Sequence, residues 1–184
     1  GIDPAKIVSV SVMPCTAKKA EAAREEMCAS GYRDVDVVIT TRELGRMIRE
    51  AGIDFNALEE AEFDSPLGTG TGAAVIFGTT GGVMEAALRT VAEVVAGKEL
   101  PKLEYNEVRG MEQTREAVID VAGVSVKVAV VHTLKSAKMM LERIKAGTAD
   151  YQFIEVMACP GGCIGGGGQP VPVDASIRQK RREA

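Results

Sequence analysis

The sequence is poor in aromatic residues and has no long apolar run. Only 4% of its 184 residues are aromatic, and tryptophan is absent. No stretch is long and apolar enough to cross a bilayer as a helix, so we expect no membrane span. Basic residues are not in excess, because the formal net charge is −4, which argues against nucleic-acid binding. A hydrophobic content of 46% is typical of a folded α/β domain with a real core.

Both ends lack the usual signs of a natural start or stop. The chain opens with GIDPAKIVSVSV, which has no initiator methionine and none of the basic and apolar regions of a secretory leader. It closes with RQKRREA, a charged, helix-favouring run without a glycine or proline stop. We therefore expect a single partial domain over residues 1–184, truncated at both ends, from a cytoplasmic protein.

In the first half of the chain, strands and helices are predicted to alternate. Valine-rich stretches predict strands at residues 7–13 and 35–40, and helical spacing predicts helices at residues 17–29 and 41–52. The order strand, helix, strand, helix favours a parallel sheet. A glycine-rich loop region with a short apolar piece at residues 73–77 follows.

The second half predicts a hairpin among further helices and strands. Residues 117–121 and 124–131 form its arms, and Ala122 and Gly123 form its turn. The other predicted elements are helices at residues 84–97 and 134–146 and strands at residues 103–108 and 151–158. We expect an α/β fold with a mainly parallel sheet, flanking helices and one antiparallel hairpin.

Two stretches carry cysteines next to strand ends, VMPCTAKKAE and EVMACPGGCIGGGGQP. Cys15 follows the strand predicted at residues 7–13, and Cys159 follows the strand predicted at residues 151–158. Ligands of open α/β sheets bind at the carboxyl ends of strands. The fold can therefore bring Cys15, Cys159 and Cys163 together although they are distant in sequence.

These cysteines admit several chemistries. A disulfide between Cys159 and Cys163 has little support, since nothing else indicates an oxidising compartment. Zinc would need a fourth ligand, and the only histidine, His132, is better interpreted as a satisfied residue at a strand end. An iron–sulfur cluster fits the glycines best, because its sulfides require close backbone N–H groups. Spacing alone does not decide between iron–sulfur, zinc and a redox disulfide.

Neighbouring residues have an ordinary and a functional interpretation. Lys18 is either a surface lysine or a donor to an anionic ligand held by Cys15. Met13 and Met157 each precede a cysteine by two positions, and they are either core filler or the lining of a site. We interpret Cys28, in EEMCASG, as a buried or incidental thiol.

The glycine cluster GTGTGAAVIFGTTGG, residues 68–82, suggests a phosphate-binding loop only weakly. It lacks the lysine of a Walker loop, and its glycines do not follow the order of the dinucleotide motif. A helix starting near Gly82 can still direct its positive end at an anionic centre. A nucleotide-binding α/β protein is therefore one alternative function.

The two cysteine stretches resemble signatures of the catalytic domain of the iron-only (FeFe) hydrogenases. The pattern Met-Pro-Cys-x-x-Lys-x-x-Glu is matched by Met13, Pro14, Cys15, Lys18 and Glu21. The pattern Glu-x-Met-Ala-Cys-x-x-Gly-Cys is matched by residues 155–163, followed by IGGGGQP. DVDVVITTRELGRMI and VIFGTTGGVMEAALR resemble the family as well. The resemblance covers essentially the whole chain and implies one lobe of a two-lobed catalytic domain.

The resemblance implies a bipartite cofactor, the H-cluster. Cys15, Cys159, Cys163 and a fourth cysteine would hold a 4Fe-4S cluster, and Cys163 would bridge to a two-iron unit with CO, CN and a dithiolate amine. Lys18 would donate a hydrogen bond to a cyanide. The residues that would line the two-iron pocket are Met13, Phe77 and Met157. Glu21 would act as structural support or as a proton relay.

The resemblance also implies an activity for the parent protein. Hydrogen and protons would be its substrates, and ferredoxin or another electron carrier its partner. The family's Thr-Ser-Cys-Cys-Pro signature is absent, so we expect this segment alone to be inactive. The alternative is a non-catalytic iron–sulfur protein related to hydrogenases, used in cluster assembly or sensing. Lys18, Met13 and Met157 count against it, because such relatives are not expected to keep them.

Overall fold

The computed structural model describes residues 2–62, 72–99 and 104–184, which form two compact units. Unit 1 consists of Gly1–Glu62 and Gly165–Lys180, and unit 2 consists of Phe63–Ile164 and Arg181–Ala184. The glycine-rich region and the strand expected at residues 103–108 lie partly outside the described residues. The expectation of one domain stays a prediction.

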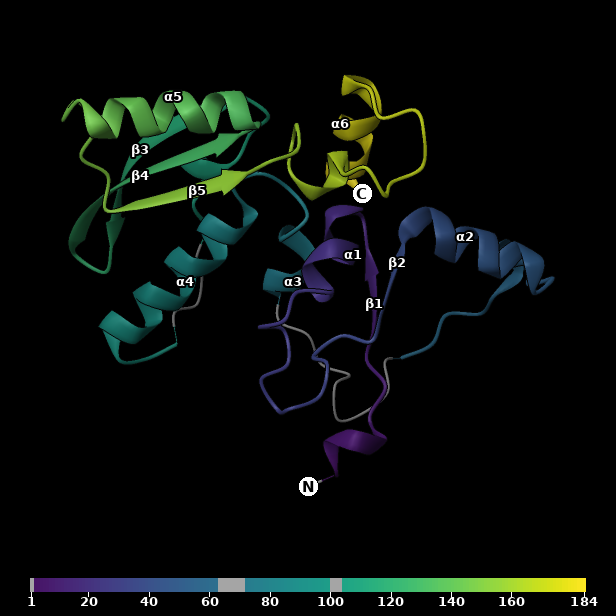
Figure 1. Cartoon of the computed structure of the whole chain (residues 1–184). Helices are drawn as coiled ribbons and strands as arrows, with labels where there is room; N and C mark the ends of the chain where they lie inside the picture. Colours follow the sequence, from purple (N-terminus) through teal and green to yellow (C-terminus); the bar gives the residue numbers. More distant parts are fainter. Residues whose placement is uncertain (1, 63–71, 100–103) are drawn as a thin grey trace. The chain divides into compact units, whose positions relative to one another are not determined.

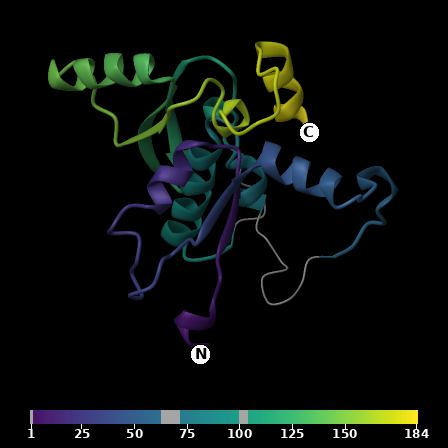
Figure 2. The same ribbon diagram turned by 45° about the vertical axis from the view of Figure 1, so that its right-hand side comes forward.

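Unit 1 is built on a parallel pair of strands, β1 (Val10–Met13) and β2 (Val37–Thr40). Met13 pairs with Thr40, so both strands end at the same edge. The helix α2 (Thr41–Glu50) leads away from the end of β2 (Figure 2). Thr40 and Glu43 form a capping box at its start. The short 3-10 helices of this unit are η1 (Pro4–Lys6) and η2 (Phe55–Ala57).

The helix α1 (Ala17–Ala22) is shorter than the helix predicted at residues 17–29. The N–H groups of Ala23 and Arg24 bond carbonyls only three residues back, which is the pattern of a helix end. None of the described α1 side chains is buried, so the helix has no buried apolar face that would stabilise further turns. The prediction is therefore wrong beyond the first six residues.

Unit 2 contains a three-stranded sheet in the order β3–β4–β5 (Figure 1). The strands are β3 (Thr114–Val121), β4 (Val124–His132) and β5 (Phe153–Met157). The first two form the predicted hairpin, and its turn residues Ala122 and Gly123 have φ of 52° and 86°. Two successive positive φ angles match the type I′ turn that suits twisted hairpins. β4 and β5 are parallel.

Helices cover both faces of this sheet (Figure 1). Successive residues of β4 point to alternate sides, so each face of the strand has its own apolar side chains to bury. Val128 and Val130 pack in one core cluster with α4, and Ala129 and Val131 pack in a second cluster with α5. The bounds of these helices are α4 (Gly82–Ala96) and α5 (Leu134–Lys145). Both helices confirm the sequence prediction.

Residues 104–108 do not form the predicted strand. Asn106–Val108 is the 3-10 helix η3, and the N–H of Val108 donates to the Tyr105 carbonyl at 3.3 Å. Tyr105 and Val108 are both buried in the core cluster with α4. Residues three apart share a face of a turn but lie on opposite faces of a strand. The core therefore selects the turn.

The remaining described helices are α3 (Gly72–Ile76), η4 (Cys163–Gly165) and α6 (Ala175–Glu183). Over the part of the chain that the structure describes, no helix combines the length and apolar character needed to span a bilayer. The α/β fold class is confirmed, and its parallel pairs β1–β2 and β4–β5 lie in two separate sheets.

Candidate functional site

The unit 2 turn, residues 159–163 (CPGGC), follows the end of β5. The carbonyl of Cys159 accepts the N–H of Gly162 at 3.0 Å. Gly161 and Gly162 have φ of 78° and 94°, left-handed backbone that glycine adopts without strain. Cys159 is half-buried and Cys163 is exposed. The turn thus places Cys159 just after the carboxyl end of a strand, as predicted, and Cys163 at the start of η4.

The GTTGG loop, residues 78–82, packs directly on the unit 2 turn. The N–H of Thr80 donates to the Gly161 carbonyl at 3.0 Å. A Cβ at Gly162 would lie 2.6 Å from the Thr80 nitrogen, so a side chain at this position would force backbone apart. The glycines of the two loops therefore permit close backbone packing around the cysteines.

The carboxylate of Glu155 caps the start of α4. It accepts the N–H of Gly81 at 2.6 Å and the N–H of Met84 at 2.7 Å, and the residue is 7% exposed. A negative charge is stabilised at a helix N-terminus. Because Glu155 engages these N–H groups, they are not available to a phosphate. The nucleotide alternative therefore loses support, although residues 68–71 lie outside the described residues.

Arg115 supports the GTTGG loop from β3. Its guanidinium donates to the Thr80 hydroxyl and to the Val108 carbonyl, each at 3.1 Å. Burial lowers the pKa of this guanidinium from its ordinary value, and the negative charges of Glu112 and Glu155 oppose that effect. A half-buried cation thus fixes the loop on which the cysteine turn rests.

The imidazole of His132 is engaged at both nitrogens. The N–H of Gly161 donates to Nδ1 at 3.2 Å, and Nε2 lies 3.2 Å from the Met111 carbonyl. The interpretation of His132 as a satisfied residue is confirmed. A zinc site with this histidine as the fourth ligand is not supported, because both nitrogens already have partners.

The unit 1 turn, residues 13–15 (MPC), lies against glycines from the carboxyl-terminal part of the same unit. The N–H of Gly168 donates to the Pro14 carbonyl at 2.9 Å, and a Cβ there would lie 2.8 Å from the carbonyl carbon. Arg42 holds this segment through its N–H to Gly168 at 3.1 Å and its side chain to the Gly167 carbonyl at 2.9 Å. The cysteine of this turn is half-buried.

A cavity of about 170 Å³ in unit 1 brings Met13, Lys18 and Glu21 together as part of its lining. The Lys18 ammonium donates to the Glu21 carboxylate at 2.7 Å. Both side chains remain partly exposed, so this ion pair contributes little to stability. It gives Lys18 a defined orientation, which the sequence did not predict.

The predicted site residues belong to both units. Those of unit 1 are Met13, Cys15, Lys18 and Glu21, and those of unit 2 are Phe77, Met157, Cys159 and Cys163. Phe77 is 47% exposed. No group of three or more His, Cys, Asp or Glu residues in the described ranges is arranged to hold a metal ion. The shared ligand set of Cys15, Cys159 and Cys163 stays a prediction.

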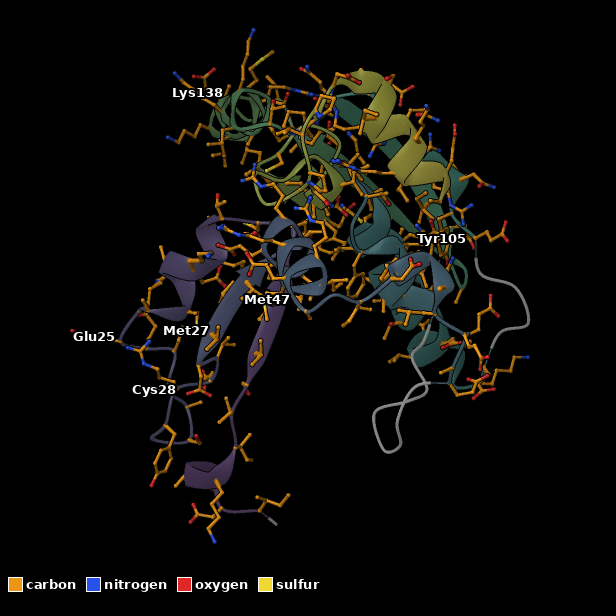
Figure 3. The ribbon with its side chains drawn as sticks, turned by 90° about the vertical axis from the view of Figure 1, so that its right-hand side faces the viewer. Glu25, Met27, Cys28, Met47, Tyr105 and Lys138 are labelled. Atoms are coloured by element: carbon orange, nitrogen blue, oxygen red, sulfur yellow. The ribbon has the colours of Figure 1, made fainter. Side chains whose placement is uncertain are left out.

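Cys28 belongs to neither turn. It lies in the loop after α1 (Figure 3), where it is exposed and its thiol donates to the Glu25 carbonyl at 2.8 Å. The buried half of the interpretation is wrong, because α1 ends before this position and most of the surrounding loop is exposed. An incidental thiol stays a prediction. Among the described residues, which include all four cysteines, none forms a disulfide.

Sequence reasoning missed the residues that hold the two turns in place. These residues are Arg42, Arg115, His132 and Glu155. Glu155 carried a signal, since it opens the carboxyl-terminal signature. Arg42 and His132 bind backbone that is distant in sequence, and Arg115 binds the distant Thr80 hydroxyl. No local pattern reveals such contacts.

Comparisons with known proteins give one consistent family. The model for "Iron only hydrogenase large subunit, C-terminal domain" matches residues 1–167. The periplasmic [Fe] hydrogenase large subunit of Nitratidesulfovibrio vulgaris is 53% identical, over 92% of this chain and 40% of that protein. The cytosolic iron-sulfur assembly component 3 of Mus musculus is 34% identical, over 91% of this chain and 36% of that protein. The chain thus spans less than half the length of these relatives.

A solved structure of the [FeFe]-hydrogenase HydA(deltaEFG) is also similar. It is 43% identical with a TM-score of 0.76, and the match covers 100% of this chain and 53% of that chain. The match in fold therefore includes all the residues that the family model matches.

Proposed function

The chain belongs to the family of the iron-only hydrogenase large subunits, in their C-terminal domain, and on this premise we propose that the full-length protein is an iron-only hydrogenase. Its reaction is the reversible interconversion of hydrogen with protons and electrons. The observation that carries the proposal is the geometry of the two cysteine turns. Each follows the end of a strand, and each is held by backbone hydrogen bonds to a glycine-containing segment.

Cys15, Cys159 and Cys163, with a fourth cysteine, would hold a 4Fe-4S cluster, and Cys163 would also bridge to the two-iron unit. The left-handed glycines of the unit 2 turn fit this group, because they let backbone approach the cluster sulfides. The sequence supports a shared cluster. Only four residues separate Cys163 from Gly168, which donates to Pro14 in the unit 1 turn.

When bound, the two-iron unit with CO, CN and a dithiolate amine supplies an open metal position and a base for splitting hydrogen. The residues of this chain would orient and shield it. The Lys18 ammonium would donate to a cyanide, and Glu21, 2.7 Å from it, would keep the side chain in place. Met13, Phe77 and Met157 would exclude water from the site.

Electrons would pass through ferredoxin or another electron carrier. A cytoplasmic location stays a prediction, and one relative is named as a periplasmic protein. We also propose that residues 1–184 are part of one catalytic domain. This is supported by the family match, which runs through residues of both units.

A second candidate function is a non-catalytic role in iron–sulfur cluster assembly or sensing. The 34% identity to a cytosolic iron-sulfur assembly component favours it. The 53% identity to a hydrogenase large subunit favours catalysis. Lys18, Met13 and Met157 also favour catalysis, because their proposed roles require a two-iron unit.

The test is anaerobic maturation of the full-length protein, followed by three measurements. Bound iron reports the cluster, infrared bands of CO and CN report the two-iron unit, and hydrogen release from reduced methyl viologen reports turnover. We expect all three signals. Iron without CO and CN bands would favour the assembly or sensing role, and absence of bound iron would reject both. Tight ATP or NAD binding by the metal-free protein would favour the nucleotide alternative.

A further inference from the structure

His132 is a buried polar residue to which the proposed reaction assigns no role. It is the last residue of β4 and is 4% exposed. Its backbone N–H donates to the Gln113 carbonyl at 3.0 Å. The imidazole reaches beyond the sheet and contacts the unit 2 turn.

The two hydrogen bonds of the ring define its tautomer. The Gly161 N–H can only donate, so Nδ1, 3.2 Å away, is the unprotonated nitrogen that accepts. Nε2 then carries the hydrogen and donates it to the Met111 carbonyl at 3.2 Å. One neutral tautomer satisfies both partners at once.

Both the backbone N–H and the backbone carbonyl of Gly161 therefore form hydrogen bonds. His132 binds its N–H, and the Thr80 N–H binds its carbonyl at 3.0 Å. Gly161 lies between Cys159 and Cys163. We propose that His132 is a positioning residue that fixes the unit 2 turn and thereby aims both thiolates at an iron–sulfur cluster. The inference rests on the proposed function, because that function makes these cysteines ligands.

The turn needs such support because of its composition. Gly161 and Gly162 are consecutive, and glycine has the largest backbone freedom of any residue. An unsupported turn would adopt several backbone conformations, of which only one places both thiolates for cluster binding. Selecting that conformation would cost binding free energy. A side chain that fixes the turn beforehand removes this cost. Loss of partners beyond the ligands commonly lowers metal affinity by about 10- to 100-fold.

Two variants separate the hydrogen bonds from the bulk of the ring. His132→Gln keeps an oxygen that can accept from Gly161 and an amide that can donate to Met111. His132→Leu fills a similar space and removes both interactions. Met140→Ala is the matched control, because Met140 is 3% exposed in the core cluster between α5 and the sheet. Its truncation lowers stability without removing a bond to the turn.

The first measurement is amide hydrogen exchange in the metal-free full-length protein. We expect the Gly161 N–H to exchange slowly in wild type and in His132→Gln. In His132→Leu it should exchange about tenfold faster or more, because the closed state loses its acceptor. In Met140→Ala, the ratio of the Gly161 exchange rate to the exchange rates of the β5 amides should be the same as in wild type. Equal Gly161 rates in wild type and His132→Leu would overturn the proposal.

The second measurement is anaerobic iron release to a chelator from the matured full-length protein, with the cluster potential followed by electron paramagnetic resonance. His132→Leu should release iron about tenfold faster and shift the potential. His132→Gln and Met140→Ala should stay close to wild type. Equally fast release from Met140→Ala would overturn positioning in favour of general destabilisation. A wild-type protein that binds no iron would reject the proposed function, and the exchange rates would still decide whether His132 holds the turn.

Discussion

Both cysteine turns are proposed to bind the same cluster, but different interactions hold them in place. In unit 2 the turn extends from a sheet that is buried on both faces between α4 and α5. In the described residues of unit 1 no apolar side chain is buried, and the turn is held by backbone bonds to Gly168 and by Arg42. Similar ligand chemistry is thus supported by a hydrophobic core in one unit and by polar contacts in the other.

This difference predicts how each turn behaves without the cofactor. A fully buried aliphatic side chain contributes about 1.5–3 kcal/mol relative to an exposed one. A hydrogen bond contributes about 0.5–1.5 kcal/mol. The core of unit 2 contains many buried aliphatic side chains. We therefore expect the unit 2 turn to keep its shape in the metal-free protein better than the unit 1 turn.

The largest expected effect comes from removing a cysteine ligand. The loss of iron and activity should be the same for either turn, whatever supports that turn. Cys15→Ala and Cys159→Ala should each lower bound iron and reduce hydrogen turnover on the order of 100-fold, because each removes one cluster thiolate. Iron analysis and a hydrogen assay on the matured full-length protein measure this. Cys28→Ala is the control, since Cys28 is exposed and belongs to neither turn. Equal iron loss in this control would refute the ligand assignment.

Truncating an apolar side chain should destabilise unit 2 more than unit 1. Leu88 in unit 2 is 3% exposed, so Leu88→Ala should lower the free energy of unfolding by about 2–5 kcal/mol. Val12 in unit 1 is 44% exposed, so Val12→Ala should change it by less than about 0.5 kcal/mol. Urea denaturation of the metal-free protein measures both. Similar losses would mean that unit 1 has a core as well packed as that of unit 2.

The polar support of unit 1 can be weakened on its own. Arg42→Ala removes the side-chain bond to the Gly167 carbonyl at 2.9 Å and keeps the backbone bond to Gly168. We expect a local loss of about 0.5–1.5 kcal/mol, seen as faster exchange of the Gly168 amide. The Gly161 amide of unit 2 serves as the internal control. If both amides accelerate equally, the two turns do not have separate supports.

The smallest effect concerns pH and the start of α2. Hydrogen bonds from Lys19 and then from Thr40 lower the pKa of Glu43 from 4.5 to about 2. Because the folded pKa is below the unfolded one, the carboxylate stabilises unit 1 above pH 4.5, and this contribution is lost as the pH falls to about 2. Solvent screening keeps the effect small.

Glu43→Gln should remove this part of the pH dependence. Amide exchange in the first turn of α2 is the measurement, because that is where Glu43 and Thr40 form their capping box. The metal-free protein has to be used so that acid release of iron does not contribute. An unchanged slope between pH 4.5 and pH 2 in the variant would assign the pH dependence to other groups.

The long periodic elements were predictable from sequence. The hairpin of β3 and β4 and the helices α4 and α5 were predicted because their apolar spacing repeats over many residues. The end of α1 was missed, since it depends on the lack of a buried face rather than on propensity. Tyr105 and Val108 were misassigned because the core of unit 2 determines their conformation.

The site was only partly predictable. Motifs identified the cysteines and grouped Met13, Lys18 and Glu21, which share one cavity in the structure. The supports were missed because each joins a side chain to a part of the chain that is distant in sequence. His132 lies 29 residues from Gly161, and Glu155 lies 74 residues from Gly81. No periodic pattern carries information over such separations.

The fit of Gly162 against Thr80 has a consequence for protein engineering. CPGGC alone does not carry its own hydrogen-bond partners, because the turn is bonded to the Thr80 amide and the His132 imidazole. A graft of the pentapeptide into a designed scaffold would carry both cysteines and leave these partners behind. The smallest portable block is the turn together with the GTTGG loop and the end of β4, three pieces that a designer has to transplant together.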